Sequence, residues 1–130
     1  MSDERKQRGR ALAARLFAGA PASGPLPADM RRYTVEHLFG DVWQGEALAI
    51  EQRSMITCCL LAASGREAEL RLHIRGARHL GIGRKALEAA ITHTAHYAGW
   101  PAGASGLRVL AEVWKSMDIE TETSGEGSEP

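Results

Sequence analysis

The sequence predicts an all-α protein of about six helices, and three observations support this prediction. Hydrophobic residues make up 44% of the chain but aromatic residues only 5%, a composition that suits packed helices better than a sheet. Apolar residues recur at helical spacing in several segments, and no segment shows the alternation of a strand. With 130 residues and no internal repeat, the chain is expected to fold as one unit with a real core.

The first 45 residues predict two helices separated by a loop. An amphipathic helix is expected around residues 7–17, followed by the glycine- and proline-rich loop 19–27. Asp29 is a suitable N-cap for a second helix that ends at Phe39, where Gly40 can take the left-handed cap conformation. A turn with Trp43 as its apolar anchor is expected over residues 41–45.

Residues 46–63 are nearly continuous helix formers and predict the central buried helix. Arg53 is its conspicuous charge, which either finds an anionic partner or extends its guanidinium to water. Cys58 and Cys59 are adjacent, so they point about 100° apart on a helix and cannot easily bridge. They are expected to be small core residues, because the chain has no CxxC and no metal-ligand cysteine spacing.

The next helix is expected to begin after the Ser64-Gly65 break and to end near residue 80. Its Arg66, Glu69 and His73 are spaced by three and four residues, so they share one strip of surface. An acid, a base and a cation on one rigid support form a plausible wall of an active site. The alternative is an ordinary i,i+4 pair of Glu69 and His73 on a solvated helix.

Residues 84–98 predict a fifth helix, with a second strip formed by His93, His96, Tyr97 and Trp100. This strip is either functional, a partly buried structural cluster, or a contact between subunits. Metal binding is not expected, because His93 and His96 have no carboxylate in the same turn.

Pro101 is expected to stop that helix, and a last one follows over residues 102–115. From Asp118 onward the chain is polar and acidic, and is expected to be disordered. The predicted organisation is therefore an N-terminal helix and loop (1–28), a helical domain (29–117) and a disordered acidic tail (118–130).

The charge pattern argues for a small acidic ligand rather than for nucleic acid or membrane. Sixteen basic residues balance sixteen acidic ones, so no overall attraction to polyanions follows. The last thirteen residues contain five acids and no base, which leaves the rest of the chain somewhat basic. The charged N-terminus lacks the apolar core of a signal peptide, and no stretch approaches a membrane span. A cytoplasmic protein is expected.

Four blocks of sequence resemble the carboxymuconolactone decarboxylase family. They are Phe39-Gly-Asp-Val-Trp43, Arg53-Ser-Met-Ile-Thr57, Gly65-Arg-Glu-Ala-Glu-Leu-Arg-Leu-His73 and Ile91-Thr-His-Thr-Ala-His-Tyr-Ala-Gly-Trp-Pro-Ala102. The resemblance implies the helical fold of AhpD-like proteins, which are usually homotrimers or homohexamers. It also implies decarboxylation of a lactone acid: γ-carboxymuconolactone loses CO2 to give β-ketoadipate enol-lactone.

The resemblance also separates this chain from the family's peroxidase branch. That branch carries a CxxC followed four residues later by a histidine, and aligning that histidine with His73 places Arg66 and Glu69 at the two cysteine positions. The branch's relay glutamate falls at Ser54. The chain departs from the decarboxylase pattern as well, at Gly83, His96 and Ser105. Thiol peroxidase chemistry is therefore not expected.

Residue types and resemblance together suggest a cofactor-free mechanism. Arg53 holds a carboxylate with its planar fork, and His73 or His93 acts as acid and base, with Glu69 orienting His73. The other predicted substrate contacts are Arg66, His96 and Tyr97, of which the last two can polarise a lactone oxygen. Two alternatives stay open: another small-molecule enzyme, such as an isomerase, cyclase or hydratase, or a non-catalytic oligomeric binding protein.

Overall fold

The computed structural model describes residues 2–22 and 24–128, and this part of the chain is all helical, as predicted. The elements are α1 (Ser2–Leu16), α2 (Ala28–Arg32), the π-helix η1 (Tyr33–Phe39), the 3₁₀ turn η2 (Val42–Gln44), α3 (Ile50–Ala63), α4 (Glu67–His79), α5 (Arg84–Ala98) and α6 (Trp100–Ser128). Three expected helices differ in length from those observed, of which the last is described below. The first starts five residues earlier than expected, and the central one begins at Ile50 rather than at residue 46.

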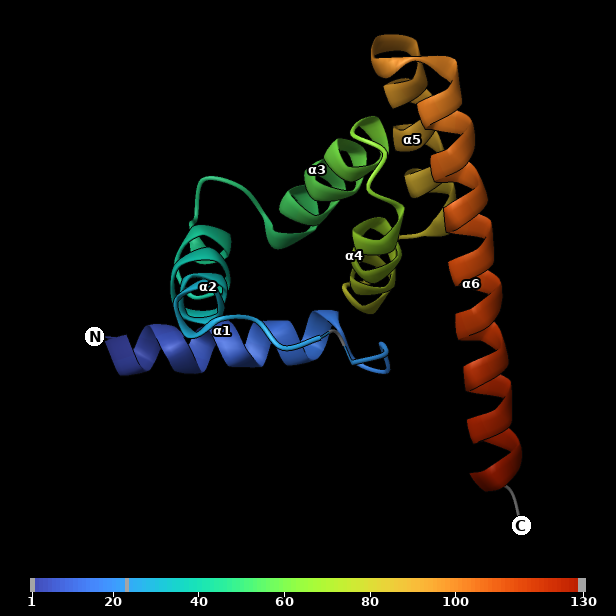
Figure 1. Cartoon of the computed structure of the whole chain (residues 1–130). Coiled ribbons are helices and arrows are strands. Elements are labelled where there is room, and N and C mark those ends of the chain that lie inside the picture. Colours follow the sequence, from blue (N-terminus) through green and yellow to red (C-terminus); the bar gives the residue numbers. More distant parts are fainter. Residues whose placement is uncertain (1, 23, 129–130) are drawn as a thin grey trace.

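The helices form two packed groups that meet at α4 (Figure 1). One group is the bundle of α3, α4, α5 and α6, whose core includes Cys58, Leu70 and Ile91. The other group is α1 with α2, η1 and η2, whose smaller core includes Leu16 and Trp43. Because α1 contacts α4 as well as η1, the N-terminal helix is part of the same folded body.

The crossing of α1 and η1 depends on two glycines. A Cβ on Gly9 would collide with the carbonyl oxygen of Val35, and a Cβ on Gly40 would collide with that of Arg5. Gly40 has φ −85°, so the left-handed cap predicted for it is wrong, and close backbone packing is what this position requires. Asp29 is also not the predicted N-cap: Pro27 occupies that position and Asp29 lies in the first turn of α2.

The breaks between the later helices follow the predictions. Gly65 has φ +71° and Gly81 has φ +90°, a conformation that glycine adopts without a Cβ penalty. Gly83 is the N-cap of α5, as expected. At the start of α3, the Gln52 side chain accepts a hydrogen bond from the Ala49 N–H at 2.8 Å, which satisfies one of the unpaired donors there.

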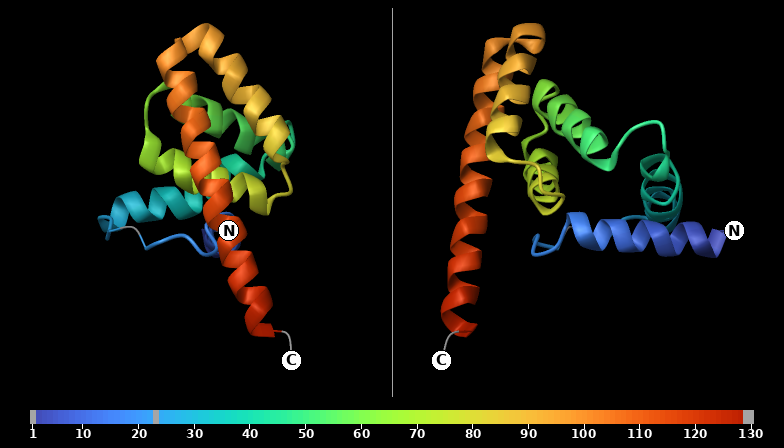
Figure 2. Two further views of the ribbon diagram at one scale, coloured as in Figure 1. Left: turned by 90° about the vertical axis from the view of Figure 1, so that its right-hand side faces the viewer. Right: turned by 180° about the vertical axis from the view of Figure 1, so that it is seen from behind.

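The C-terminal segment differs most from expectation, because α6 continues through the part predicted to be a disordered tail. It runs as one helix to Ser128 and extends beyond the bundle (Figure 2). Two acids of the expected tail are paired with α4, Asp118 with Arg78 at 2.6 Å and Glu120 with Arg75 at 2.8 Å. These pairs and the burial of Met117 give the segment tertiary contacts that its composition does not reveal. Residues 129–130 of the expected tail lie outside the described residues.

Pro101 was predicted to stop the fifth helix, but α5 already ends at Ala98. Pro101 instead lies in the first turn of α6, where its missing N–H has no intrahelical partner to lose. Among the described residues, no helix combines the length and the apolar character needed to cross a membrane.

Candidate functional site

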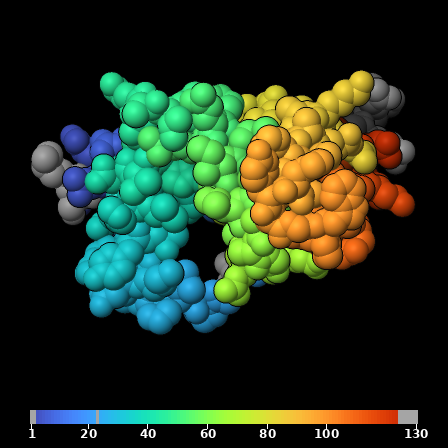
Figure 3. Space-filling model, turned by 90° about the horizontal axis from the view of Figure 1, so that it is seen from above, coloured from blue at the N-terminus to red at the C-terminus, as the bar shows by residue number. Residues whose placement is uncertain are grey.

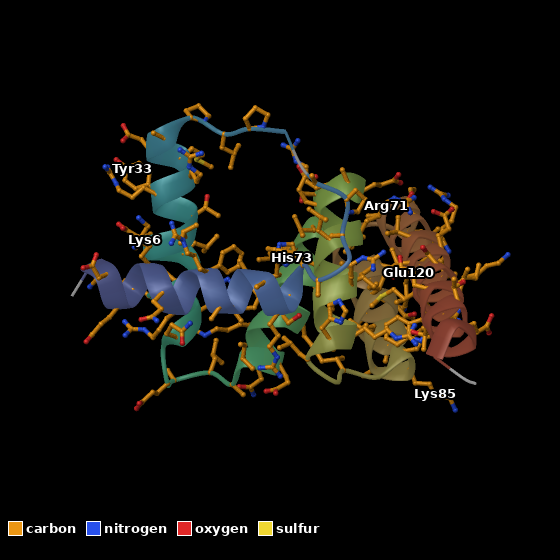
Figure 4. The ribbon with its side chains drawn as sticks, turned by 90° about the horizontal axis from the view of Figure 1, so that it is seen from below. Lys6, Tyr33, Arg71, His73, Lys85 and Glu120 are labelled. Carbon is orange, nitrogen blue, oxygen red and sulfur yellow. The ribbon has the colours of Figure 1, made fainter. Side chains whose placement is uncertain are left out.

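His73 lies in an aromatic pocket where the two helical groups meet. The Trp43 ring stacks against the imidazole, with centroids 6.2 Å apart and planes inclined by 26°. The Phe17 ring meets the imidazole edge-on at 5.3 Å, and Phe39 touches both Phe17 and Trp43 at 5.7 and 5.6 Å. We call Phe17, Phe39 and Trp43 the aromatic wall. Figure 4 shows His73 on the side of α4 that faces α1.

The molecular surface has an opening between its two helical groups. Seen from above, the space-filling view is open between the segment that joins α1 to α2 and the helices α3 and α4 (Figure 3).

The surroundings of His73 favour the neutral imidazole. Burial lowers its pKa below the ordinary 6.5, and the charge of Glu69 opposes this effect. The Nδ1 atom is buried and has no hydrogen-bond partner. Buried polar atoms are normally satisfied, so an unpartnered ring nitrogen is a feature to explain, and a bound ligand is one explanation. A perturbed titratable group in a recess is also a common sign of a functional site.

Arg53 and Ser54 contribute further unpartnered atoms from α3. The Arg53 guanidinium donates through Nη2 to the carbonyl oxygen of Gly45 at 3.2 Å, just after the turn that carries Trp43. Its Nε is buried without a partner, and no described carboxylate forms an ion pair with it. Neither alternative for Arg53 applies as stated: it has no anionic partner among the described residues, and its Nε is not exposed to water. Ser54 is fully buried, and its Oγ also lacks a partner.

Glu69 and Arg66 lie near His73 along the chain but do not touch it. Both are exposed, Glu69 in the first turn of α4 and Arg66 at its N-cap. No hydrogen bond joins Glu69 to the imidazole among the contacts of the described residues, so Glu69 acts on His73 through its charge alone.

The second predicted strip lies elsewhere, on the outer face of α5. His93, His96 and Tyr97 are exposed there, with Tyr97 at 82%. Their ring contacts are within the strip. The ring centroids of His93 and Tyr97 are 5.1 Å apart, and those of His96 and Trp100 are 5.5 Å apart. By exposure, the predicted site residues divide into Arg53 and His73, which are partly buried and which we call the inner group, and exposed residues on α4 and α5.

Cys58 is not in a state suited to thiolate chemistry. Cys58 is fully buried, and burial raises its pKa to about 12. Reactive cysteines need an accessible thiolate, which Cys58 does not offer. Cys59 is partly buried and both thiols are free. Within the part of the chain that the structure describes, no group of three or more His, Cys, Asp or Glu side chains could hold a metal ion.

Sequence reasoning did not predict four residues of this region as site residues. Phe39, Trp43 and Ser54 lie within the blocks that resemble the family, so a signal was present, but their contacts were not predictable from spacing. Phe17 had no such signal. It follows the N-terminal helix directly, and only the fold brings it to His73.

Within the described residues, the partly buried His73 imidazole with its lowered pKa and its aromatic wall is the strongest candidate for a functional site, and this chain is a helical bundle. The chain belongs to the carboxymuconolactone decarboxylase family, whose family model matches residues 28–112. It is 34% identical over 94 residues to a 4-carboxymuconolactone decarboxylase of Acinetobacter baylyi, a match covering 72% of this chain and 70% of the relative.

A second relative is the nitrosuccinic acid decarboxylase npaB of Metarhizium robertsii. It is 37% identical over 93 residues, which cover 72% of this chain and 65% of that protein. Both relatives are named as decarboxylases, although their named substrates differ.

Proposed function

We propose that this protein is a decarboxylase of a small carboxylic acid, with Arg53 binding a carboxylate and His73 handling the proton. The observation that carries the proposal is the pair of buried unpartnered nitrogens, Arg53 Nε and His73 Nδ1, in a family whose named relatives are decarboxylases. A guanidinium without a carboxylate partner is suited to an anionic ligand, because its fork matches two oxygens.

The names of the relatives' substrates indicate the kind of acid to expect. One is a lactone acid and the other a nitro acid, so each carries a group that can accept electrons when CO2 leaves. We infer that the substrate of this chain has the same two features, a carboxylate to be lost and an electron-accepting group conjugated with the carbon that bears it.

The step requires one proton and no external electron acceptor. The bond between the carboxylate and its carbon breaks, and its electron pair moves into the lactone or nitro group as an enolate or nitronate. CO2 leaves, and His73 transfers a proton from water to the carbon that carried the carboxylate. The chemistry needs no organic cofactor, since the substrate supplies the electron acceptor. A neutral, partly buried imidazole suits this role, because positioned histidines transfer protons in either direction.

The experiment offers the protein two acids, 4-carboxymuconolactone and nitrosuccinate, and measures CO2 release and product formation. Arg53→Gln removes the charge and Arg53→Lys keeps it without the fork. We expect KM to rise strongly in Arg53→Gln and less in Arg53→Lys. Arg84→Gln, at an exposed pair on α5, is the matched control. If wild-type protein releases no CO2 from either acid or from other lactone and nitro acids, the proposal fails.

A further inference from the structure

The end of α1 reaches the site although it lies outside the matched residues 28–112. Leu16 is fully buried against α4, where a Cβ on Gly76 would be 3.3 Å from the Leu16 Cβ. The next residue, Phe17, places its ring edge 5.3 Å from the His73 ring, with the planes 87° apart. Because Trp43 covers a face of the same imidazole, His73 is held between two aromatic rings from different elements.

The segment after Phe17 is fastened to α4 by polar contacts. A ring nitrogen of His79, Nε2, lies 2.9 Å from the carbonyl oxygen of Ala18. Beside it, Arg75 donates to both carboxylate oxygens of Glu120 at 2.8 and 3.0 Å. A Cβ on Gly19 would lie 3.4 Å from Arg75 Nη1 and 3.8 Å from Glu120 Oε2. We call these contacts of Ala18, Gly19, Arg75, His79 and Glu120 the clasp.

The clasp joins both ends of the chain to one helix. Arg75 is only 8% exposed, so its bidentate pair with Glu120 is shielded from water on the arginine side. Glu120 comes from the extension of α6, beyond the matched residues, and the Ala18–Gly19 segment comes from before them. The His79 contact attaches the Ala18 carbonyl to α4, and the Arg75–Glu120 pair lies against Gly19, so both adjoin the turn that follows Phe17.

We propose that Phe17 is a positioning residue of the His73 site, and that the clasp holds its ring against the imidazole. The ring keeps water from one side of His73 and limits rotation of the imidazole while Trp43 covers another. The inference rests on the proposed role of His73 in proton transfer, but its principal test needs no turnover. It assigns a function in the site to two segments that flank the matched family region.

Phe17 is uncharged, so its effect on His73 can be separated from the effects of nearby charges. From α1 and η2 the groups against the imidazole are Phe17 and Trp43, both uncharged. The charge that acts on His73 is Glu69 of its own helix. The charges of the clasp, Arg75, His79 and Glu120, form their contacts with one another and with the Ala18 carbonyl. Removing the Phe17 ring thus changes the hydration and freedom of His73 while these charges stay.

The test is an NMR titration of the histidine side chains in labelled protein. The chain has five histidines, and His73→Gln assigns the His73 signal by its disappearance. We expect Phe17→Ala to raise the pKa of His73 towards its ordinary value, because water gains access to the charged form. Phe17→Leu, which keeps apolar bulk, should restore much of the difference. Glu120→Gln should move the pKa in the same direction by a smaller amount.

Leu12→Ala is the matched control. Leu12 is a buried residue of α1 in the core against which Phe17, the residue just after that helix, is packed, and its side chain has no ring to place against His73. We expect it to lower the thermal midpoint as Phe17→Ala does and to leave the His73 titration in place. If Leu12→Ala shifts that titration as much, Phe17 is ordinary packing and the proposal is overturned.

The other outcomes are also decisive. A folded Phe17→Ala protein with an unchanged His73 titration overturns the role of Phe17. If Phe17→Ala does not fold, Phe17→Leu and Glu120→Gln decide the matter, and no shift in either overturns it. If the His73 titration is unchanged in Glu120→Gln but shifts in Phe17→Ala, the proposed role of the clasp is overturned and that of Phe17 stands. A wild type that shows the expected titrations but decarboxylates nothing contradicts only the proposed function. With an active substrate, Phe17→Ala should lower kcat more than it raises KM.

Discussion

At the scale of single residues, His73 combines three properties that rarely occur together without a function. It is partly buried, it is stacked by Trp43, and its Nδ1 has no partner among the described side chains and backbone groups. A histidine that only filled space would be expected to satisfy its buried nitrogen with a backbone or side-chain group. His79 in the same helix does so, through the Ala18 carbonyl. The contrast between the two is the reason to assign the proton transfer to His73.

His73→Gln is expected to lower the turnover number by roughly 10²–10⁴-fold, the usual contribution of a positioned proton-transfer group. Glutamine keeps much of the volume, so the fold should persist. Turnover and the thermal midpoint are measured on the same preparation. A stable His73→Gln protein with full activity would exclude His73 from the mechanism and direct attention to His93.

The pKa of His73 also predicts how stability depends on pH. The unfolded chain binds a proton at the ordinary value of about 6.5, whereas the folded chain binds it at a lower pH. Stability is therefore full above this value and decreases as pH falls through the window below it. His73→Gln should flatten this part of the profile, measured by urea unfolding at a series of pH values. An equally steep decrease in the variant would contradict the burial of the imidazole.

In contrast to His73, the two cysteines are expected to be dispensable for activity. Cys58→Ala combined with Cys59→Ala should retain activity, because the Cys58 thiol is buried with a pKa raised to about 12. We expect a packing loss of about 1 kcal/mol for each truncation, which denaturant unfolding can measure. Loss of turnover in a folded double variant, or thiol-dependent peroxide reduction by the wild type, would show that redox chemistry was wrongly excluded.

At the scale of the elements, α4 connects the parts of the molecule. One side of it carries His73 towards α1 and η2, and another side carries Arg71, Arg75 and Arg78 towards acids of α6. Arg78 also covers the Trp114 ring at 4.6 Å, a cation–π contact. The π-helix η1 belongs to the same pattern, since π-helical turns are frequent at functional sites, and Phe39 of the aromatic wall is its last residue.

The pairing of α4 with α6 predicts an acid-sensitive contact. The hydrogen bonds from Arg75 hold the pKa of Glu120 below its usual range, so the pair stabilises the fold above the unfolded pKa of Glu120. This contribution is lost as pH falls through the lower, folded value. Glu120→Gln should be less stable than the wild type at neutral pH, and the two should converge at low pH. Thermal melts across the acid range measure the difference, and parallel curves would contradict it.

At the scale of the whole molecule, the exposed apolar side chains indicate self-association. Tyr97 is 82% exposed, Trp100 67% and Leu60 63%, all in the bundle of α3, α5 and α6. Of the three tryptophans, Trp43 is buried, Trp114 is partly covered and Trp100 is exposed. Exposed apolar side chains that gather into a patch mark interaction sites.

We expect a homotrimer or homohexamer in which the strip of His93, His96, Tyr97 and Trp100 is covered by a second copy. Light scattering after size-exclusion chromatography measures the mass. Tyr97→Ser with Trp100→Ser should lower it while the helical content stays unchanged. Leu26→Ser, an exposed position in the loop before α2, is the control. A monomeric wild type at micromolar concentrations would contradict this expectation.

The sequence by itself determined the helices and several of their breaks. The apolar period of 3.6 residues and the glycines at positions 65 and 81 act locally, so they are legible without a fold. Arg53 was also identifiable, because a charge in an apolar helix stands out, and His73 was identifiable from its spacing with Arg66 and Glu69 and from the family resemblance. The tertiary structure decided which of the candidates share a site. It brought Phe17 and Trp43 to His73 and left His93 on an outer face.

The same distinction explains the acidic segment after Met117. Its composition is that of a solvated chain, and only the buried Arg75 of a distant helix gives Glu120 a partner. Contacts between residues 45 positions apart depend on how helices cross, which local spacing does not encode. Local chemistry therefore predicted the elements and the reactive residues, whereas helix packing selected the inner site, its aromatic wall and the clasp.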